Sequence, residues 1–234
     1  MNILAIGAHP DDLEILCAGT LAKYSKEGHK VFMAHLCSGN MGGKDIPQEQ
    51  LAEIRDKEAR ASAEIIQAEV LGPICADLGV HLTQEMREKV ADIIRVAQPD
   101  LIITHSPQDY MPDHVITSQL VFESAFAATL PYFKTKYQAH EKITPIYYMD
   151  TLLGLKSQSE FYIDITDHFE TKRAMFLCHE SQYKWLKGHH LTDPFQMIET
   201  MAKFRGLQSG VMYAEAFQME RVWGRVRPID LLPF

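Results

Sequence analysis

Short apolar runs alternate with longer segments of helical periodicity along the first half of the chain. Four of the runs have the length and apolar character of buried strands: residues 2–8, 30–36, 70–74 and 101–104. Apolar residues recur at helical spacing in the four segments that follow them: residues 13–27, 47–69, 83–97 and 115–128. This alternation predicts a Rossmann-like α/β fold, in which helices cover both faces of a mostly parallel sheet.

Two of the predicted helices carry more detailed signals. In the helix over 47–69, the expected buried stripe consists of Leu51, Ile54, Ala61 and Ile65. In the helix over 83–97, Thr83 stands where an N-cap residue is preferred. Its expected inward residues are Met86, Val90 and Ile94.

The second half of the chain is less regular. Strands are predicted at 143–149 and 162–165, and helices at 166–179 and 194–205. Residues 213–217 are expected to contribute to packing rather than to a functional site. We find no linker, repeat or low-complexity stretch, so we expect residues 1–234 to form a single domain.

Composition and charge exclude several classes of partner. The formal net charge is -8 and the basic residues form no stripe, which argues against nucleic-acid binding and against a polybasic membrane anchor. A strand-like run directly follows Met1, with no secretory leader or long apolar span, so we expect a cytoplasmic protein. The four cysteines are scattered and are expected to be buried thiols: Cys17, Cys37, Cys75 and Cys178.

The first candidate for chemistry lies at the end of the first predicted strand. His9, Asp11 and Asp12 stand at the expected turn into the first helix. Ligands bind outside the carboxyl ends of the strands in open α/β sheets, and imidazole with carboxylate suits a catalytic zinc. Helix capping by the two aspartates is the alternative, but a cap uses one acidic residue and does not require the histidine. The pattern therefore favours a site.

A second polar cluster follows the predicted strand at 101–104. It spans residues 105–114 and ends in Asp113 and His114. His114 could supply a third metal ligand, with Asp113 orienting a ring nearby. The alternatives are that His114 is simply a polar residue of the next helix's first turn and that His105 is a hydrogen-bonded loop histidine. For His105, the role of a hydrogen-bonded loop histidine is preferred over that of a metal ligand.

These motifs resemble those of the LmbE-like, or PIG-L, zinc-dependent N-deacetylases. The resemblance covers most of the chain, and its most specific part is His9-Pro10-Asp11-Asp12-x-Glu14 with the later Pro112-Asp113-His114. Weaker matches follow in the right order: Ser38-Gly39-Asn40-Met41-Gly42, Arg55-x-x-Glu58-Ala59, Ser181-Gln182 and residues 210–217.

The resemblance implies an activity and a set of roles. His9, Asp12 and His114 would bind zinc, Asp11 would be the general base, and Asp113 would assist catalysis. The substrate-binding residues would be Arg55, Asn40, Gly42 and Tyr110. The enzyme would remove the acetyl group from the amine of a small N-acetylglucosaminyl-type substrate, a class that includes precursors of low-molecular-weight thiols. The family resemblance also implies a homo-oligomer. The apolar residues at 229–234 add a little support, because an exposed apolar terminus often packs against another surface.

Met111 departs from the family pattern. Many members have a histidine at this position, which stabilises the charged tetrahedral intermediate with the aspartate before the zinc histidine as its partner. A thioether cannot donate a hydrogen bond. Metal binding is unaffected, but the oxyanion donor and the role of Asp113 are open. The candidates for a replacement are Tyr110, His189 and His190.

Other interpretations remain open at this point. The chain could be a non-catalytic Rossmann-like module that holds a sugar, or a zinc amidase that acts on a larger thiol conjugate. Arg55 and Glu58 could form only an exposed ion pair on a helix. Residues 188–190 are expected to form a solvated turn rather than a metal site.

Overall fold

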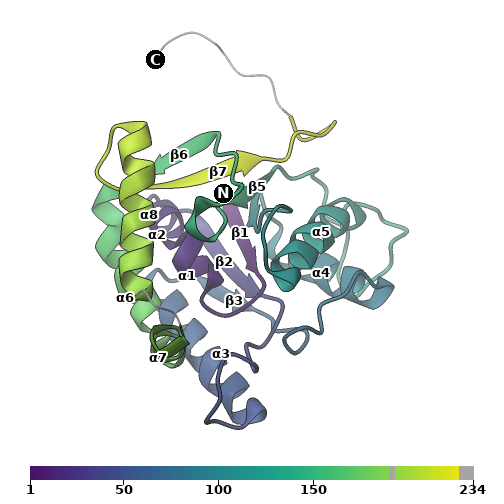
Figure 1. Cartoon of the computed structure of the whole chain (residues 1–234). Helices are drawn as coiled ribbons and strands as arrows, with labels where there is room; N and C mark the ends of the chain where they lie inside the picture. Colours follow the sequence, from purple (N-terminus) through teal and green to yellow (C-terminus); the bar gives the residue numbers. More distant parts are fainter. Residues whose placement is uncertain (190–192, 227–234) are drawn as a thin grey trace.

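A seven-stranded sheet crosses the computed structural model, which describes residues 1–189 and 193–226 (Figure 1). The strands are β1 (Asn2–Gly7), β2 (Lys30–His35), β3 (Glu69–Leu71), β4 (Leu101–Thr104), β5 (Ile146–Met149), β6 (Phe161–Asp164) and β7 (Ala214–Met219). Their order is β3-β2-β1-β4-β5-β7-β6. The first five in this order are parallel, and β7 is antiparallel to both of its neighbours. The predicted mostly parallel α/β sheet is confirmed.

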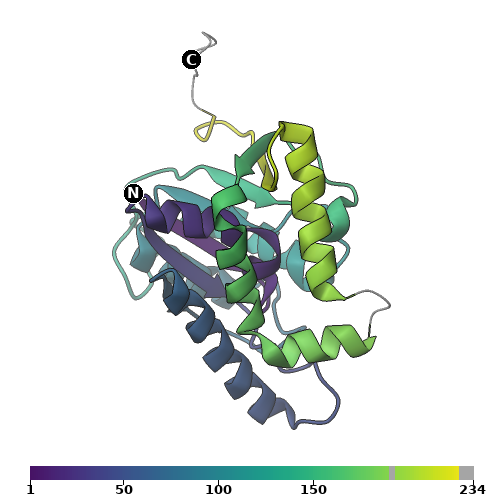
Figure 2. The same ribbon diagram turned by 90° about the vertical axis from the view of Figure 1, so that its left-hand side faces the viewer.

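Helices lie on both faces of the sheet (Figures 1 and 2). They are α1 (Asp12–Leu16), α2 (Ala18–Lys26), α3 (Gln48–Ile65), α4 (Gln84–Ala97), α5 (Pro112–Ala127), α6 (Phe169–Leu177), α7 (Glu180–His189) and α8 (Pro194–Ser209). Leu4 and Ile6 of β1 pack in the core with α4 and α5, whereas Ile3 and Ala5 pack in the core with α1, α2 and α6. This is the alternation of a strand buried on both faces. A third cluster joins α6 to α8.

The first two predicted helices differ from the observed ones. The helix expected over 13–27 is interrupted at Cys17, which separates α1 from α2. The helix expected to reach residue 69 ends at Ile65. Its inward face also differs, because Ala61 and Ile65 are exposed while α3 buries the residues Leu51, Arg55, Ala59, Ser62 and Ala63. Two polar side chains of α3 therefore point inward, toward partners that periodicity cannot reveal.

Other expectations can be compared directly. Thr83 caps α4 by accepting a hydrogen bond from the backbone N–H of Met86, as predicted. Residues 213–217 contribute most of strand β7, which was not expected. Gly188 and His189 belong to α7 rather than to a turn, and His190 lies outside the described residues, as does the apolar end at 229–234. No helix of the described part has the length and hydropathy needed to cross a membrane.

A buried carboxylate joins the last strand to the first helices. Glu215 of β7 accepts hydrogen bonds from the backbone N–H groups of Gly19 and Thr20, in the first turn of α2, at 3.0 and 2.7 Å. It also pairs with Lys172 of α6, and both side chains are almost completely buried. A helix N-terminus attracts negative charge, so this carboxylate suits its position. The C-terminal strand thus holds the helices that frame the carboxyl end of β1.

We predict that Lys172→Met lowers the free energy of unfolding by about 3–5 kcal/mol, because it leaves the Glu215 carboxylate buried without its counter-charge. Urea denaturation measures this loss. The control is Lys184→Met, which removes an exposed ion pair with Glu180 and should cost at most about 1 kcal/mol. Equal effects of the two substitutions would contradict the structural role of the buried pair.

Candidate active site

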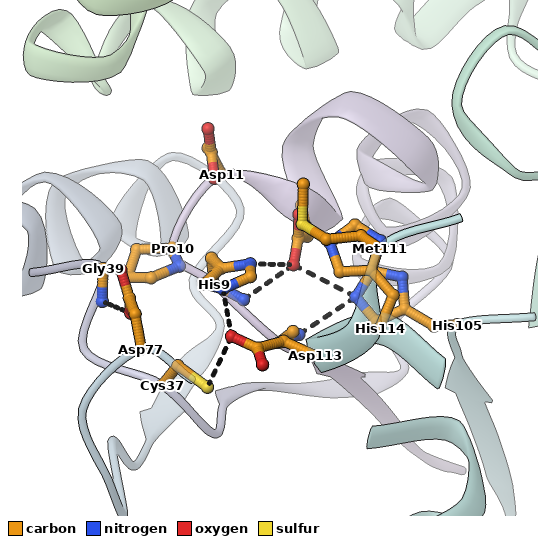
Figure 3. A network of polar contacts seen from close by, with 12 residues as sticks. His9, Pro10, Asp11, Cys37, Gly39, Asp77, His105, Met111, Asp113 and His114 are labelled. Atoms are coloured by element: carbon orange, nitrogen blue, oxygen red, sulfur yellow. Dashed lines mark hydrogen bonds and ion pairs between the residues drawn. The ribbon is translucent and has the colours of Figure 1, made fainter. Parts of the chain in front are cut away.

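The two polar motifs meet at the carboxyl ends of β1 and β4, which are neighbouring parallel strands. His9 lies in the turn after β1, Asp12 begins α1, and His114 lies in the first turn of α5, beyond the loop that follows β4. One ligand atom from each of these three residues lies within 4.8 Å of the others, and all three residues are poorly accessible. Figure 3 shows His9 and His114 in one network of polar contacts, and the centroids of their rings lie 5.6 Å apart.

The positions of the donor atoms suit a metal ion. Asp12 Oδ1 lies 3.2 Å from His114 Nε2, and Asp12 Oδ2 lies 3.5 Å from His9 Nδ1. Within the described part of the chain, both ring nitrogens of the buried His114 lack a directed hydrogen bond, so the contacts of this ring with Asp12 and Asp109 are ion-pair contacts. Two imidazole nitrogens and one carboxylate oxygen are the donor set of many catalytic zinc sites. The residues therefore fit a divalent cation.

Two further carboxylates contact the histidine nitrogens that do not face Asp12. Asp113 Oδ2 lies 3.0 Å from His9 Nε2 and also accepts the backbone N–H of Leu78 at 2.9 Å. Asp109 Oδ2 lies 3.2 Å from His114 Nδ1. A carboxylate on the far nitrogen fixes the orientation of a metal-binding imidazole. The sequence suggested that Asp113 could orient a ring, but Asp109 was not singled out. Its only signal was its place in the polar loop.

The cluster strongly perturbs its own protonation. Burial lowers the pKa of His9, but hydrogen bonds with Asp113 and Asp12 outweigh it and raise the pKa to about 10. Burial lowers the pKa of His114 as well, but the neighbouring carboxylates of Asp12 and Asp109 outweigh burial and raise this pKa to about 9. Burial would raise the pKa of Asp12, and the neighbouring His114 and His105 instead hold it well below its usual range. The Asp12 carboxylate is thus ionised, which is the form of a carboxylate that binds a metal ion.

Asp11 is separated from this cluster although it is adjacent to Asp12. Its backbone has φ 116°, a region that non-glycine residues rarely adopt. Its side chain points away from the histidines (Figure 3) and makes no helix-capping bond. The interpretation of Asp11 and Asp12 as simple caps is therefore wrong. Burial raises the pKa of Asp11, and Arg55 opposes this rise, with a resulting pKa of about 6.

Arg55 of α3 is buried and holds the turn that carries Asp11. Its Nη2 donates to Asp11 Oδ1 at 2.8 Å and to the Pro10 carbonyl, and its Nη1 donates to the Gly39 carbonyl at 3.0 Å. A Cβ on Gly39 would lie 2.5 Å from the guanidinium, so the close packing requires glycine there. The exposed pair with Glu58 is not observed, because Glu58 instead accepts the backbone N–H and hydroxyl of Ser181.

Two other buried groups complete the site. His105 is fully buried, stacks on the ring of His114 with centroids 3.8 Å apart, and lies 3.0 Å from the Ala8 amide through Nε2. This agrees with the predicted hydrogen-bonded loop histidine, although Asp109, His105 and His114 form a second group with ligand-like spacing. Glu14 is also fully buried and lies 3.1 Å from His179 Nε2. That pair joins α1 to the segment between α6 and α7.

A cavity of about 400 Å³ opens above these residues. Arg55, Gly42 and Tyr110 line it, as does Met111. Asn40 is not part of the lining, and its Oδ1 accepts the backbone N–H of Asp77 at 3.0 Å. Among the candidates for the missing oxyanion donor, Tyr110 lies at the cavity and is 65% exposed. The side chains of His189 and His190 lie outside the described part.

A family model described as PIG-L, GlcNAc-PI de-N-acetylase, matches residues 4–125, which include both motifs. The chain belongs to this family. Diacetylchitobiose deacetylase of Thermococcus kodakarensis is 28% identical to this PIG-L protein over 93% of the chain and 82% of its own length. The 4-oxalmesaconate hydratase of Pseudomonas putida is 24% identical over 93% and 88%.

Solved structures of PIG-L-like proteins have the same fold. The N,N'-diacetylchitobiose deacetylase of Pyrococcus horikoshii superimposes with a TM-score of 0.81 and 28% identity, over 93% of this chain and 83% of that one. The 4-carboxy-2-hydroxymuconate hydratase of Pseudomonas putida superimposes over the full length of both chains with a TM-score of 0.84 and 22% identity. The fold that carries the site is thus shared by relatives with different reactions.

The metal assignment makes a prediction for this PIG-L site. His9→Ala and His114→Ala should each lose bound zinc, because each removes one of only three protein ligands. Metal analysis of the purified, zinc-loaded variants measures the loss. Asp109→Asn should weaken zinc binding by only about 10–100-fold, since it alters the orientation of a ligand.

His81→Ala is the control, because that exposed histidine lies outside the site. If Asp109→Asn abolished binding while His9→Ala retained it, the metal would belong to the group of His105, Asp109 and His114 instead.

Proposed function

We propose that this protein is a zinc-dependent deacetylase that hydrolyses the N-acetyl group of a small N-acetylglucosaminyl-type substrate. One observation carries the proposal: His9, Asp12 and His114 converge on the floor of a cavity that Asp11 also lines, in a chain of the PIG-L family. The deacetylase relatives support the substrate class. Precursors of low-molecular-weight thiols belong to that class.

The three ligands and their supporting carboxylates would hold the metal in place. A bound zinc lowers the pKa of water toward neutrality and polarises a carbonyl oxygen. His9 and His114 present one nitrogen each toward Asp12, while Asp113 and Asp109 face the opposite nitrogens. We infer that Asp113 is a positioning residue that acts through His9. In many family members the partner of this aspartate is a histidine at the position of Met111. Because that histidine is absent here, the observed partner of Asp113 is His9.

Asp11 is the proposed general base. Its pKa of about 6 lies close to neutrality, which favours a group that must accept a proton and later return it. Arg55 fixes Asp11 Oδ1 at 2.8 Å and thereby sets the orientation of the carboxylate. Asp11 would take the proton of the attacking water and return it to the departing amine. The products would be acetate and a free amine.

The hydratase relative offers a second candidate reaction, on a carboxylated substrate. Such a substrate needs cationic partners in the cavity. Arg55 is the only Lys or Arg among the described lining residues, and its guanidinium already serves Asp11, Pro10 and Gly39. The same lining includes four aspartates: Asp11, Asp12, Asp77 and Asp113. Apart from the proposed metal ion, the described lining thus offers a carboxylated substrate no Lys or Arg side chain that is free to bind it, which favours the deacetylase.

Two other functions share parts of this site. A sugar-binding module without catalysis would bind N-acetylglucosaminides but release no acetate. An amidase for thiol conjugates, such as the mycothiol S-conjugate amidase of Streptomyces coelicolor that is 25% identical to this chain over 222 residues, would keep the metal site and prefer a larger substrate. An acetate-release screen of N-acetylglucosaminides with the zinc-loaded protein separates these possibilities. We also propose a cytoplasmic homo-oligomer, and a monomer mass in light scattering would refute that assembly.

The neighbours Asp11 and Asp12 should respond differently to the same change. Asp11→Asn removes the basic oxygen without altering the ligands, so it should retain zinc and lose at least about 10²-fold in kcat. Asp12→Asn should lose zinc. Zinc content and acetate release are measured on both variants. Wild-type turnover by Asp11→Asn, or equal loss of zinc by both, would place the base elsewhere.

Arg55→Lys keeps the positive charge but not the planar fork that bonds three acceptors. We expect kcat to fall at least about 10-fold, corresponding to about 1.4 kcal/mol, while zinc is retained. Because Arg55 is buried, we also expect a loss of about 1.5–3 kcal/mol in the free energy of unfolding. Arg60→Lys on the exposed face of α3 is the matched control. Unchanged kinetics in Arg55→Lys would remove Arg55 from the mechanism.

A further inference from the structure

The cavity beside His9, Asp12 and His114 is lined by both charged and apolar side chains. Its charged lining residues, called the floor here, are the two histidines, the aspartates and Arg55. Six of its aliphatic lining residues are called the apolar wall: Ile15, Leu16, Leu152, Leu186, Met197 and Ile198. These residues come from α1, from the segment after β5, and from α7 and α8. The floor and the apolar wall line one continuous cavity.

The wall packs partly in the core and partly faces the cavity: Ile198 belongs to the buried cluster of α6 and α8, and Ile15 and Leu16 pack against core clusters while staying partly accessible. Ile15, Leu16, Leu152, Leu186 and Met197 are all only partly buried, although each is a large aliphatic side chain. A cavity surface of this kind is stabilised when apolar ligand atoms cover it. The six side chains contain no hydrogen-bond donor or acceptor of strength, so sugar hydroxyls placed against them would lose their water without gaining partners.

Two lining residues of α7, Gln182 and Trp185, carry polar groups. Gln182 lines the cavity, but its amide donates to the Gly42 carbonyl at 3.0 Å and lies 3.4 Å from the hydroxyl of Ser181. It therefore holds the Gly42 loop against α7. The charged groups of the lining all belong to the floor, next to the proposed reaction centre.

The sequence position of the wall adds a second argument. The family match ends at residue 125, so Leu152, Leu186, Met197 and Ile198 all lie beyond the segment that defines the family. The ligands and the proposed base lie within it. Four of the six wall residues thus lie outside the segment that carries the proposed ligands and base, whereas Ile15 and Leu16 lie within it.

We propose that the substrate carries an unbranched alkyl chain, and that this chain lies against the apolar wall while the amide lies over the metal ligands. The inference rests on the proposed deacetylase function for the position of the amide. The alkyl chain could belong to the acyl group or to the group attached to the sugar, since both present the same methylenes to the wall. Each buried methylene is worth about fourfold in affinity.

Two substrate series test this inference. One consists of N-acetylglucosaminides with methyl to hexyl groups on the anomeric oxygen, and the other of glucosamines with N-acetyl to N-hexanoyl groups. We expect kcat/KM to rise about threefold to fourfold per methylene over part of one series. Met197→Gln should reduce the preference for the longest chain at least about fivefold, whereas Leu207→Gln, an 82% exposed leucine on the same helix, should keep it.

Equilibrium binding makes the test independent of turnover. Calorimetry with the zinc-loaded protein compares methyl and hexyl N-acetylglucosaminide, and N-acetyl and N-hexanoyl glucosamine. Tighter binding of a longer chain, lost in Met197→Gln, supports the apolar site even if no acyl group is released, in which case only the deacetylase function fails. Hydrolysis of the methyl compound with no effect of chain length on turnover or affinity overturns the inference and leaves the function standing. An absence of any chain-length preference in binding also overturns it.

Discussion

The buried carboxylate of Asp12 is the constraint on which the rest of the site depends. It accepts the backbone N–H of His9 at 2.6 Å and lies within 3.5 Å of nitrogens from His9, His105 and His114. A negative charge in such a position is stable only with compensating positive charge, from protonated rings or from a metal ion. Because β1 and β4 are neighbours, the residues that provide this compensation come from two loops about a hundred positions apart. The sheet order is therefore a requirement of the chemistry.

The sequence predicts those parts of the site whose signal is local. His9, Asp11 and Asp12 directly follow one strand, His114 follows another, and the carboxyl ends of parallel strands share one edge of the sheet. Thr83 was recognised as a cap for the same reason, since its partner is three residues away. Burial that depends on distant partners was not anticipated. Arg55, which was named only through the family resemblance, and Ser62 are buried because Asp11 and Glu14 face them. A periodicity that expects apolar residues inside selects Ala61 and Ile65 instead.

Met111 shows how a single substitution redistributes the roles of its neighbours. With a thioether at this position, Asp113 is bonded to His9 and to the backbone of Leu78. The change also places an apolar side chain beside the charged floor of the cavity. The proposed metal ligands His9, Asp12 and His114 match the family pattern, while Met111 adds an apolar side chain to the cavity lining. The fold thus tolerates changes in the lining because the ligands are fixed by the strand ends beneath it.

The bond between Glu215 and the start of α2 has a consequence for the order of folding. It joins positions almost two hundred residues apart, and the same carboxylate neutralises Lys172. During synthesis, the motif that begins at His9 emerges long before β7 does. Until residue 215 is available, the first turn of α2 lacks its acceptor and α6 carries an uncompensated lysine. Long-range contacts of this kind form late and slow the completion of a fold. On the ribosome, the framework around the proposed metal ligands of the first half would therefore become rigid only after β7 had been synthesised.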